Sequence, residues 1–516
     1  MLTQTENNKR LAKNTLLLYG RMLLTVGISF YSTRLILANL GIDNYGIYNV
    51  IGGFVSMFYM VTSTMTQAVS RFLTFELGTG NKKKLQQTFS TSINILLLLS
   101  LVVVLLAETV GLWFVNYKLN ISPNRMNAAN WIYQFSVLSF VCEMISVPYS
   151  ASVISHEKMG AFALVTILKV LLTLGIALLL SVSPIDKLVF YGILVLLVSI
   201  SIQLMYWIYC RKHFHECKYS LHIDKNIFKS MFGFAGWNFL TTCASMLSTQ
   251  GVSIILNMHF GTIINAAKGV ASQVNGTVGA FSRNFMIALN PQITKSYAAK
   301  EIEYTKNLVC QGAKFTYLLF FFLALPCILE TNFLLSKWLK EVPPYAGIFV
   351  QLSLLNSIIE ILLNSSETLN RATGKIRNLQ ILLGTTQLLI LGISYIVIII
   401  TENPIWTMAV TNILYLLIFV PRIMINRPFI NITFKYYFKN VLCGIIIMSI
   451  LATLTSLIPM YYMHNGWPRL ITVCIVSTMS IIFFSYLFVL TKKEKFKLLG
   501  LIKNKIYFKI HTVKKF

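Results

Sequence analysis

The sequence predicts an all-α protein that crosses a membrane many times. Hydrophobic residues make up 56% of the 516 positions and charged residues only 12%, and the mean hydropathy is +0.68. Soluble domains carry about a quarter charged residues, so half that share indicates that much of the surface contacts lipid. The apolar residues also fall into runs of helix length, and helices satisfy their own backbone hydrogen bonds in lipid.

The net charge of +27, from 44 Lys+Arg against 17 Asp+Glu, does not indicate a nucleic-acid partner. Proteins that bind nucleic acids carry their basic residues on polar surfaces. Here apolar runs long enough to span a membrane separate the basic clusters. We therefore expect no nucleic-acid binding, and we explain the basic excess by membrane topology.

A membrane-spanning helix needs about 20 mainly apolar residues. The first apolar run is too long and too polar for a cleavable signal peptide, so it is predicted to be a spanning helix. With it, the sequence predicts about fourteen spans. In chain order they are 14–38, 43–73, 88–117, 127–152, 162–183, 187–210, 229–257, 264–290, 307–332, 344–368, 378–400, 405–424, 439–463 and 468–490.

The basic residues predict the orientation of these helices, because Lys and Arg in short loops favour the cytoplasmic side. With both termini inside, 31 of the 44 Lys+Arg lie in cytoplasmic loops and tails, 6 in outer loops and 7 within spans. Tryptophan prefers the membrane interface, and five of the seven Trp fall at the predicted outer interface. They are Trp113, Trp131, Trp338, Trp406 and Trp467. The sequence thus predicts cytoplasmic termini.

The longest predicted inner loop, 211–228, separates two groups of helices. A shift of 220 positions places Asn39-Leu40-Gly41 over His259-Phe260-Gly261, so two similar halves are expected. Paired six-helix halves are a known transporter plan, with the substrate site between them. The predicted organisation is an N-lobe (1–210), a solvated linker without a metal site (211–228), a C-lobe (229–424), two further helices (425–490) and a basic amphipathic tail on the inner leaflet (491–516).

Seven basic residues lie inside predicted spans, where a charge costs about 2.5 to 3.5 kcal/mol and needs a partner, water or a function. They are Arg21, Arg34, Arg71, Lys169, Lys268, Arg283 and Lys314. Arg71 and Lys314 lie close to the inner interface, which their long side chains can reach. Arg21 shares a helical face with hydroxyl side chains, as a water-facing residue would.

Segment 264–290 has the clearest polar face, and segment 43–73 is similarly polar. The face of 264–290 consists of Lys268, Ser272, Asn275, Gly279 and Ser282, with Arg283 beside it. Such faces either bond neighbouring helices or line an aqueous cavity. A cavity lined by Arg21, Lys268 and Arg283, with Arg34 as a further candidate, would attract an anion, and phosphate fits arginine well.

Three intramembrane carboxylates, Glu143, Glu360 and Glu367, allow two interpretations. A buried carboxylate can bind a coupling cation or a proton. It can also neutralise a neighbouring Lys or Arg. The sequence leaves both open, so H⁺ or Na⁺ coupling is an expectation, and no other cofactor is predicted.

Several motifs resemble one bacterial family. They are Arg34-x-x-Leu37-x-x-Leu40-Gly41, Tyr45-Gly46-Ile47-Tyr48, Gly52-Gly53, Arg71-Phe72-Leu73, Val147-Pro148-Tyr149, His156-Glu157-Lys158-Met159 and Asn290-Pro291-Gln292-Ile293. Together they are similar to polysaccharide-biosynthesis export proteins of the O-antigen flippase type. These belong to the multidrug/oligosaccharidyl-lipid/polysaccharide (MOP) superfamily. The resemblance covers roughly 10–310.

The resemblance implies two six-helix lobes around a cationic cavity in the bacterial cytoplasmic membrane. It implies alternating-access transport of undecaprenyl-diphosphate-linked oligosaccharides for O-antigen or capsule synthesis. The expected partners are this lipid-linked substrate and membrane lipids, for a functional monomer beside the polysaccharide polymerase machinery. A cation-coupled multidrug exporter of the same superfamily is the alternative. It would need acidic residues in the first two spans, and no Asp lies between Asn14 and Leu40 or between Gly46 and Arg71. An enzyme is not expected, because the outer loops are short and nearly free of Asp, Glu and His.

Overall fold

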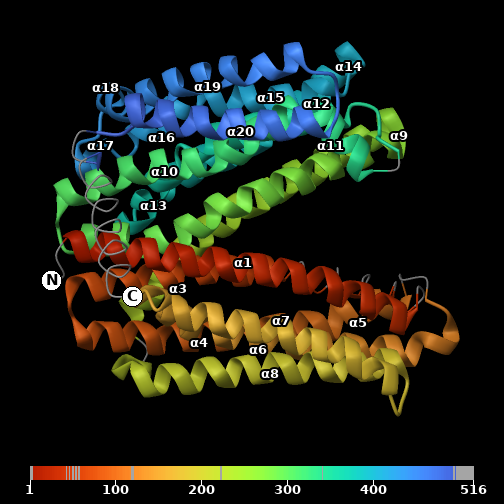
Figure 1. Ribbon diagram of the computed structural model, residues 1–516. Coiled ribbons are helices and arrows are strands. Elements are labelled where there is room, and N and C mark those ends of the chain that lie inside the picture. The colour runs from red at the N-terminus through yellow and green to blue at the C-terminus, as the bar shows by residue number, and fades with distance from the viewer. Residues whose placement is uncertain are drawn as a thin grey trace, which may run out of the picture. The chain divides into compact units, whose positions relative to one another are not determined.

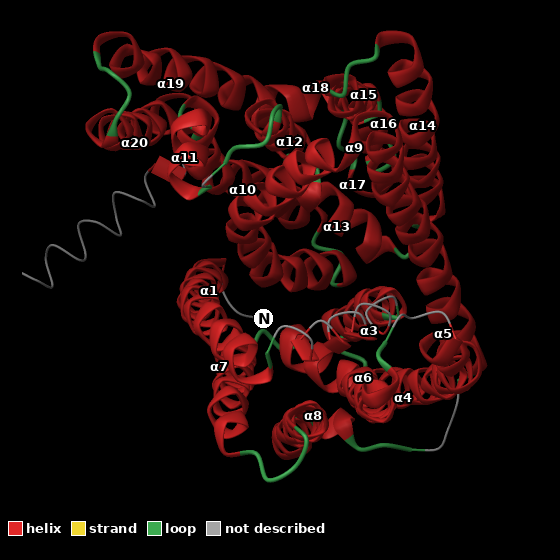
Figure 2. Ribbon diagram, turned by 90° about the vertical axis from the view of Figure 1, so that its right-hand side faces the viewer, coloured by secondary structure: helices red, strands yellow, loops and turns green. Residues whose placement is uncertain are grey.

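The computed structural model describes residues 4–41, 44–45, 47–48, 51–52, 55, 58–117, 121–220, 224–339, 341–491 and 494–495. Its regular structure is helical, and no strand occurs among these residues (Figure 2). Most of the predicted tail 491–516 and parts of the stretch 42–57, with the Gly46 and Gly53 motif positions, lie outside the described residues. The chain divides into two compact units, which are described separately.

Unit 1 comprises Met1–Met246, Asn284–Ile302 and Thr368–Thr385. Its helices run side by side for most of their length (Figure 1). They are α1 (Gln4–Leu40), α3 (Tyr59–Thr79), α4 (Lys82–Leu106), α5 (Leu112–Tyr117), α6 (Met126–Ser155), α7 (Met159–Leu179), α8 (Lys187–His213) and both ends of α9 (Lys225–Ala298). Helix α6 packs against α8, α3 and α4, and α1 packs along α7.

The starts of three helices follow from local sequence. Side chains of Asn81, Asp186 and Asp224 accept hydrogen bonds from backbone N–H groups in the first turns of α4, α8 and α9. A carboxylate or amide oxygen at this position satisfies donors that have no partner within the helix. The polar residues between the apolar runs therefore begin the next helix as well as separating the spans.

Unit 2 comprises Leu247–Arg283, Glu303–Glu367 and Thr386–Phe516. It contains the middle of α9, most of α10 (Ile302–Leu329) and the later helices. These are α11 (Thr331–Trp338), α12 (Ala346–Ile361), α13 (Asn364–Thr373), α14 (Arg377–Thr401), α15 (Ile405–Leu417), α16 (Phe419–Met424), α17 (Arg427–Ile430), α18 (Phe434–Tyr437), α19 (Cys443–Tyr462) and α20 (Trp467–Phe484). The second half of α13 and the first part of α14 belong to unit 1.

The predicted all-α membrane fold is confirmed. The described residues contain 11 helices long and apolar enough to cross a membrane, or 12 if α12 and α13, bent by 44°, form one span. The bent pair matches the predicted span 344–368. The other two predicted spans, 43–73 and 264–290, correspond to α3 and to α9 after Gly261, and these are the two segments with polar faces. Their polarity keeps them below the hydropathy of a lipid-facing helix.

The internal similarity has a counterpart in the backbone. Gly41 ends α1 with φ +79°, and Gly261, which the 220-residue shift aligns with it, interrupts α9 with φ +76°. Side chains disfavour this left-handed region, so a glycine is the natural residue at each turn. Each predicted half thus reverses direction after its first helix at an equivalent glycine.

The compact units do not have the boundaries of the predicted lobes. Residues 284–302 and 368–385, which belong to helices of the predicted C-lobe, pack within unit 1. The lobe assignment concerns similarity between the two halves of the sequence, so it stays a prediction. The consequence for function is that unit 1 contains helix ends from both halves.

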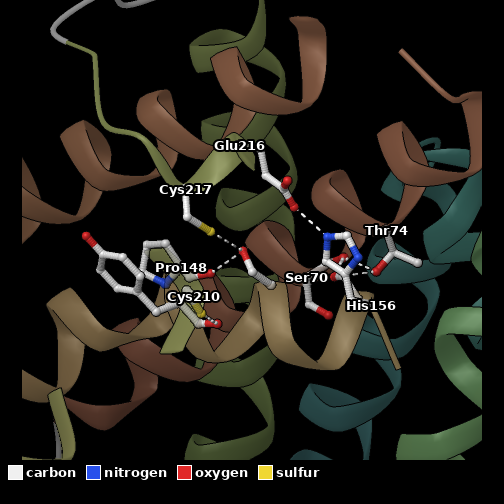
Figure 3. A network of polar contacts seen from close by, with 10 residues as sticks. Ser70, Thr74, Pro148, His156, Cys210, Glu216 and Cys217 are labelled. Atoms are coloured by element: carbon white, nitrogen blue, oxygen red, sulfur yellow. Dashed lines mark hydrogen bonds and ion pairs between the residues drawn. The ribbon is translucent and has the colours of Figure 1, made fainter. Parts of the chain in front are cut away.

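The start of the predicted linker is fastened to α6 (Figure 3). His156 donates a hydrogen bond to Glu216 Oε1 at 2.5 Å, and its ring stacks on Phe214. The Cys217 thiol contacts Ser152 Oγ at 3.7 Å. Burial by itself raises the pKa of Glu216, but the hydrogen bond from His156 outweighs it and holds this pKa below its usual range. The sequence predicted a solvated linker, yet Phe214, Glu216 and Cys217 are buried against the helix end, while His215 between them is exposed.

Candidate functional site

Arg21 lies in unit 1, half-buried on α1. Its guanidinium donates a hydrogen bond to Asn284 Oδ1 at 2.7 Å and lies 5.0 Å from the ring centre of Phe162. Its buried Nε has no hydrogen-bond partner among the described residues. The residue therefore joins α1, α7 and the end of α9, and part of its hydrogen-bonding capacity is unused. Arg34, also on α1, is exposed one to two turns before the helix ends.

Lys268 lies in unit 2, on the arm of α9 that follows Gly261. Its Nζ donates to the Thr249 carbonyl at 2.8 Å and to Ser253 Oγ at 2.9 Å. Both partners belong to the arm before Gly261, so the lysine crosses the helical hairpin. An ammonium has three donors, so one remains for a ligand.

Arg283 extends back along the same arm of α9. Its Nη2 donates to the Gly276 carbonyl at 2.6 Å. A Cβ built on Gly279 would lie 2.8 Å from Nη1, so the missing side chain at Gly279 leaves the space that the guanidinium occupies. Thr249 precedes the turn by twelve positions, which in a helical hairpin is about level with position 273. The heads of Lys268 and Arg283 therefore both extend toward the middle of the segment between them.

The intramembrane bases differ in their partners. Lys169 pairs with Glu143, and Lys314 lies 3.9 Å from Glu494, with both side chains of the latter pair nearly buried. In the described part of the chain, no carboxylate forms an ion pair with Arg21, Lys268 or Arg283. These are the three residues that the sequence predicted to line a cavity, and all three lack an ion pair with a described carboxylate.

The sequence suggested that the long side chains of Arg71 and Lys314 reach the inner membrane interface, but both residues have partners within the protein. Arg71 donates from Nε to the Arg371 carbonyl at 3.1 Å and from Nη2 to the Ala372 carbonyl at 2.7 Å. These carbonyls end α13, where a cation is favoured by the helix dipole. Lys314 is buried beside Glu494. Each thus has a protein partner instead of reaching the interface alone.

All three predicted carboxylates lie beside a cation. Glu143 pairs with Lys169, and Glu367 pairs with the buried Arg422. Glu360 lies farther from Arg422, with an Oε1 to Nη1 distance of 3.9 Å, and its side chain is 39% exposed. The contacts neutralise the charges of Glu143 and Glu367, whereas the side chain of Glu360 is the most exposed of the three. Coupling through any of them stays a prediction.

Sequence reasoning missed Arg422, which it assigned to an inner loop. The residue lies on α16, the short helix that follows α15, and its guanidinium lies 5.7 Å from the ring centre of Tyr415. A spacing of seven positions places Tyr415 and Arg422 on one helical face. This spacing, continued past Pro421, was the available signal.

Helix ends from both halves of the sequence are joined in unit 1. Lys295 at the end of α9 pairs with Glu157 at the end of α6 at 2.8 Å, and the Glu157 side chain is only 9% exposed. Asn14 of α1 donates to the Glu157 carbonyl at 3.2 Å. Together with the contacts of Arg71 to the end of α13, we call these contacts the latch. By the predicted orientation, the latch lies at the cytoplasmic ends of its helices.

No protein-family model matches the sequence, and no curated protein matches it significantly. Solved structures do match. An outward-facing multidrug resistance MATE transporter of the MOP superfamily matches with a TM-score of 0.70 at 10% identity, over 82% of this chain and 96% of that one. The chain has the fold of the MATE transporters.

Two other structures cover the same shares of the chains. MATE in the bent conformation matches with a TM-score of 0.70 at 11% identity. A MOP superfamily transporter from Pyrococcus furiosus, described as having a binding pocket of reverse polarity that suggests a different function, matches with a TM-score of 0.65 at 10% identity. At these identities the similarity shows the fold, and with the apolar helices it shows a multi-pass membrane protein.

Proposed function

We propose that the protein is a flippase for undecaprenyl-diphosphate-linked oligosaccharides in the bacterial cytoplasmic membrane. The observation that carries the proposal is the presence of three intramembrane cations, Arg21, Lys268 and Arg283, that form no ion pair with a described carboxylate. An unneutralised cation within a membrane requires an anionic ligand or water. A diphosphate supplies acceptors for charge-assisted hydrogen bonds at this depth. The resemblance of residues 10–310 to the O-antigen flippases supports the same substrate class.

Arg283 and Lys268 are held in place by hydrogen bonds within the protein and still have donors left for a ligand. Arg283 has five N–H donors and uses one on Gly276, and Lys268 uses two of three within the hairpin. These internal hydrogen bonds hold the side chains in place, which lowers the entropy lost on binding. The polyprenyl chain of the substrate would remain in lipid.

Alternating access would require the latch to open on the cytoplasmic side. Lys295→Gln should increase cytoplasmic access, because it removes the only charge that neutralises the nearly buried Glu157 among the described residues. We expect maleimide labelling of a cysteine placed at Ala298 to rise several-fold. Lys300→Gln, an exposed-loop control close by, should leave labelling unchanged. Equal labelling in both variants would show that the ion pair does not restrict opening.

Glu360 is our candidate for proton or Na⁺ coupling, since it is the most accessible of the three carboxylates and has the most distant cation. A carboxylate beside a cation can take up a proton or a cation when the neighbouring charge moves away. Coupling remains part of the proposal and is tested with it.

The transport experiment uses the full chain in proteoliposomes loaded with the lipid-linked oligosaccharide fraction of the host cells. We expect arrival of the glycan in the opposite leaflet, detected by a membrane-impermeant lectin or glycosidase, with and without pH and Na⁺ gradients. Ethidium is the parallel probe for the rival function, a multidrug exporter of the same fold. Ethidium transport without glycan transport would overturn our proposal.

A further inference from the structure

A separate polar cluster lies in unit 1 on helices other than those of the three unpaired cations. Tyr59 of α3 donates a hydrogen bond to Glu143 Oε2 at 2.5 Å, and Lys169 of α7 pairs with the other carboxylate oxygen of this α6 residue. Lys169 is the middle residue of Met159–Leu179, and Glu143 lies near the middle of Met126–Ser155. The pair is therefore close to the middle of the predicted membrane.

This ion pair is exposed although both of its residues lie within predicted membrane spans. The side chains of Lys169 and Glu143 are 45% and 26% exposed, and Tyr59 is 41% exposed. The pairs Arg422–Glu367 and Arg469–Glu330, in comparison, reach at most 14%. Neutralising a charge does not require exposure, and facing lipid with an open ion pair would be costly. The cluster is therefore expected to face water.

The cluster lies between two packed pairs of helices. Helix α1 packs along α7, and α3 packs along α6 (Figure 2). The contact between Lys169 and Glu143 joins these two helix pairs. The ring of Tyr59 packs edge-on against the buried Phe140, with centroids 5.2 Å apart. One part of the phenol is thus anchored while another remains accessible.

The chemistry of the cluster differs from that of the three cations. Its carboxylate and ammonium cancel in charge, so the cluster gives no net attraction for a phosphate. It offers hydrogen-bond acceptors on Glu143, donors on Lys169 and a planar aromatic surface on Tyr59. Uncharged ligands with many hydroxyl groups, which both donate and accept, match this set.

We propose that Tyr59, Glu143 and Lys169 form a subsite for an uncharged sugar of the transported glycan. This inference rests on the proposed flippase function and adds the recognition of the sugar to that of the diphosphate. The sugar hydroxyls would donate to the free lone pairs of Glu143 and accept from Lys169, and a sugar face would pack on the exposed part of the Tyr59 ring.

The test compares two ligands in nanodiscs, the host's lipid-linked oligosaccharide fraction and sugar-free undecaprenyl diphosphate. The double variant Glu143→Leu/Lys169→Met removes both charges together, so no unpaired charge remains to unfold the bundle. We expect it to bind the oligosaccharide lipid about 10-fold or more weakly, because it loses several hydrogen bonds to the sugar. Tyr59→Phe keeps the ring but removes the hydrogen bond that holds Glu143 in place, so it should weaken binding of this ligand about 3-fold or more. Neither change should alter binding of undecaprenyl diphosphate.

Tyr461→Phe makes the same chemical change at an 85% exposed position on α19 and should bind both ligands as the parent chain does. If a variant binds both ligands equally more weakly, the effect is a general structural one and the subsite is overturned. Unchanged binding of the oligosaccharide lipid would also overturn the subsite. If the parent chain binds neither ligand, the flippase function fails and the subsite fails with it. Loss of the subsite alone, with normal binding by the parent, leaves the flippase function in place.

Discussion

The double variant Lys268→Ala/Arg283→Ala should lose transport of lipid-linked oligosaccharides while remaining folded in the membrane. Each cation can form charge-assisted hydrogen bonds worth about 1.5 to 3 kcal/mol. Loss of both should weaken recognition of the diphosphate by about 100-fold or more, because each 1.4 kcal/mol is a factor of ten. The measurement is the rate of glycan arrival in the opposite leaflet of proteoliposomes.

Folding should survive because neither cation neutralises a described carboxylate. Their removal leaves the Thr249 and Gly276 carbonyls, which belong to helical backbone, and no opposite charge. Lys82→Ala/Lys83→Ala removes the same charge from exposed positions at the start of α4 and is the matched control. Transport by the Lys268/Arg283 variant at the rate of this control would exclude a role for the two cations in substrate binding.

Arg283→Lys separates charge from geometry. A lysine keeps the positive charge but cannot reproduce the planar set of donors that arginine offers to a phosphate. We expect partial transport, between the rates of the parent and of Arg283→Ala.

The sequence could predict what depends on pattern along the chain. Gly41 and Gly261 were aligned by the 220-residue shift, and both take a left-handed φ at a turn because local geometry demands it. The polarity of segments 43–73 and 264–290 likewise survives in the structure, since it is a property of each helix by itself. The fourteen predicted spans and the 12 apolar helices of the described residues therefore differ by these two polar segments.

Partnerships between helices could not be predicted in the same way. Glu143 and Lys169 lie on different helices, and only packing brings them together. Lys295 and Glu157 are 138 positions apart, and Arg469 and Glu330 are 139 apart. Hydropathy does not encode which faces meet. It therefore identified intramembrane charges such as Lys169 without showing that some are neutralised and others are not.

Arg469→Ala should be the most destabilising single substitution considered. Arg469 begins α20 and donates from Nε and Nη2 to the two oxygens of Glu330, each at 2.7 Å, while the Glu330 side chain has no exposed surface. Removing one partner of a buried pair leaves an uncompensated charge and costs about 3 to 5 kcal/mol. In a two-state domain of about 150 to 250 residues, each kcal/mol lowers Tm by about 2 to 4 °C. We expect a loss of at least about 6 °C in thermal unfolding of the purified protein.

Lys337→Ala, at an exposed base on α11, should change stability by less than about 0.5 kcal/mol and serves as the control. The double variant Glu330→Leu/Arg469→Met distinguishes charge from packing. Replacing both members of a buried pair by apolar side chains is often close to neutral, so the double variant should recover most of the lost Tm. If it is as unstable as Arg469→Ala, the arginine acts through its packed stem. If it recovers, the ion pair together with the Tyr317–Ser449 hydrogen bond of 2.7 Å specifies how α19 and α20 attach to α10, and the last two helices are an integral part of unit 2.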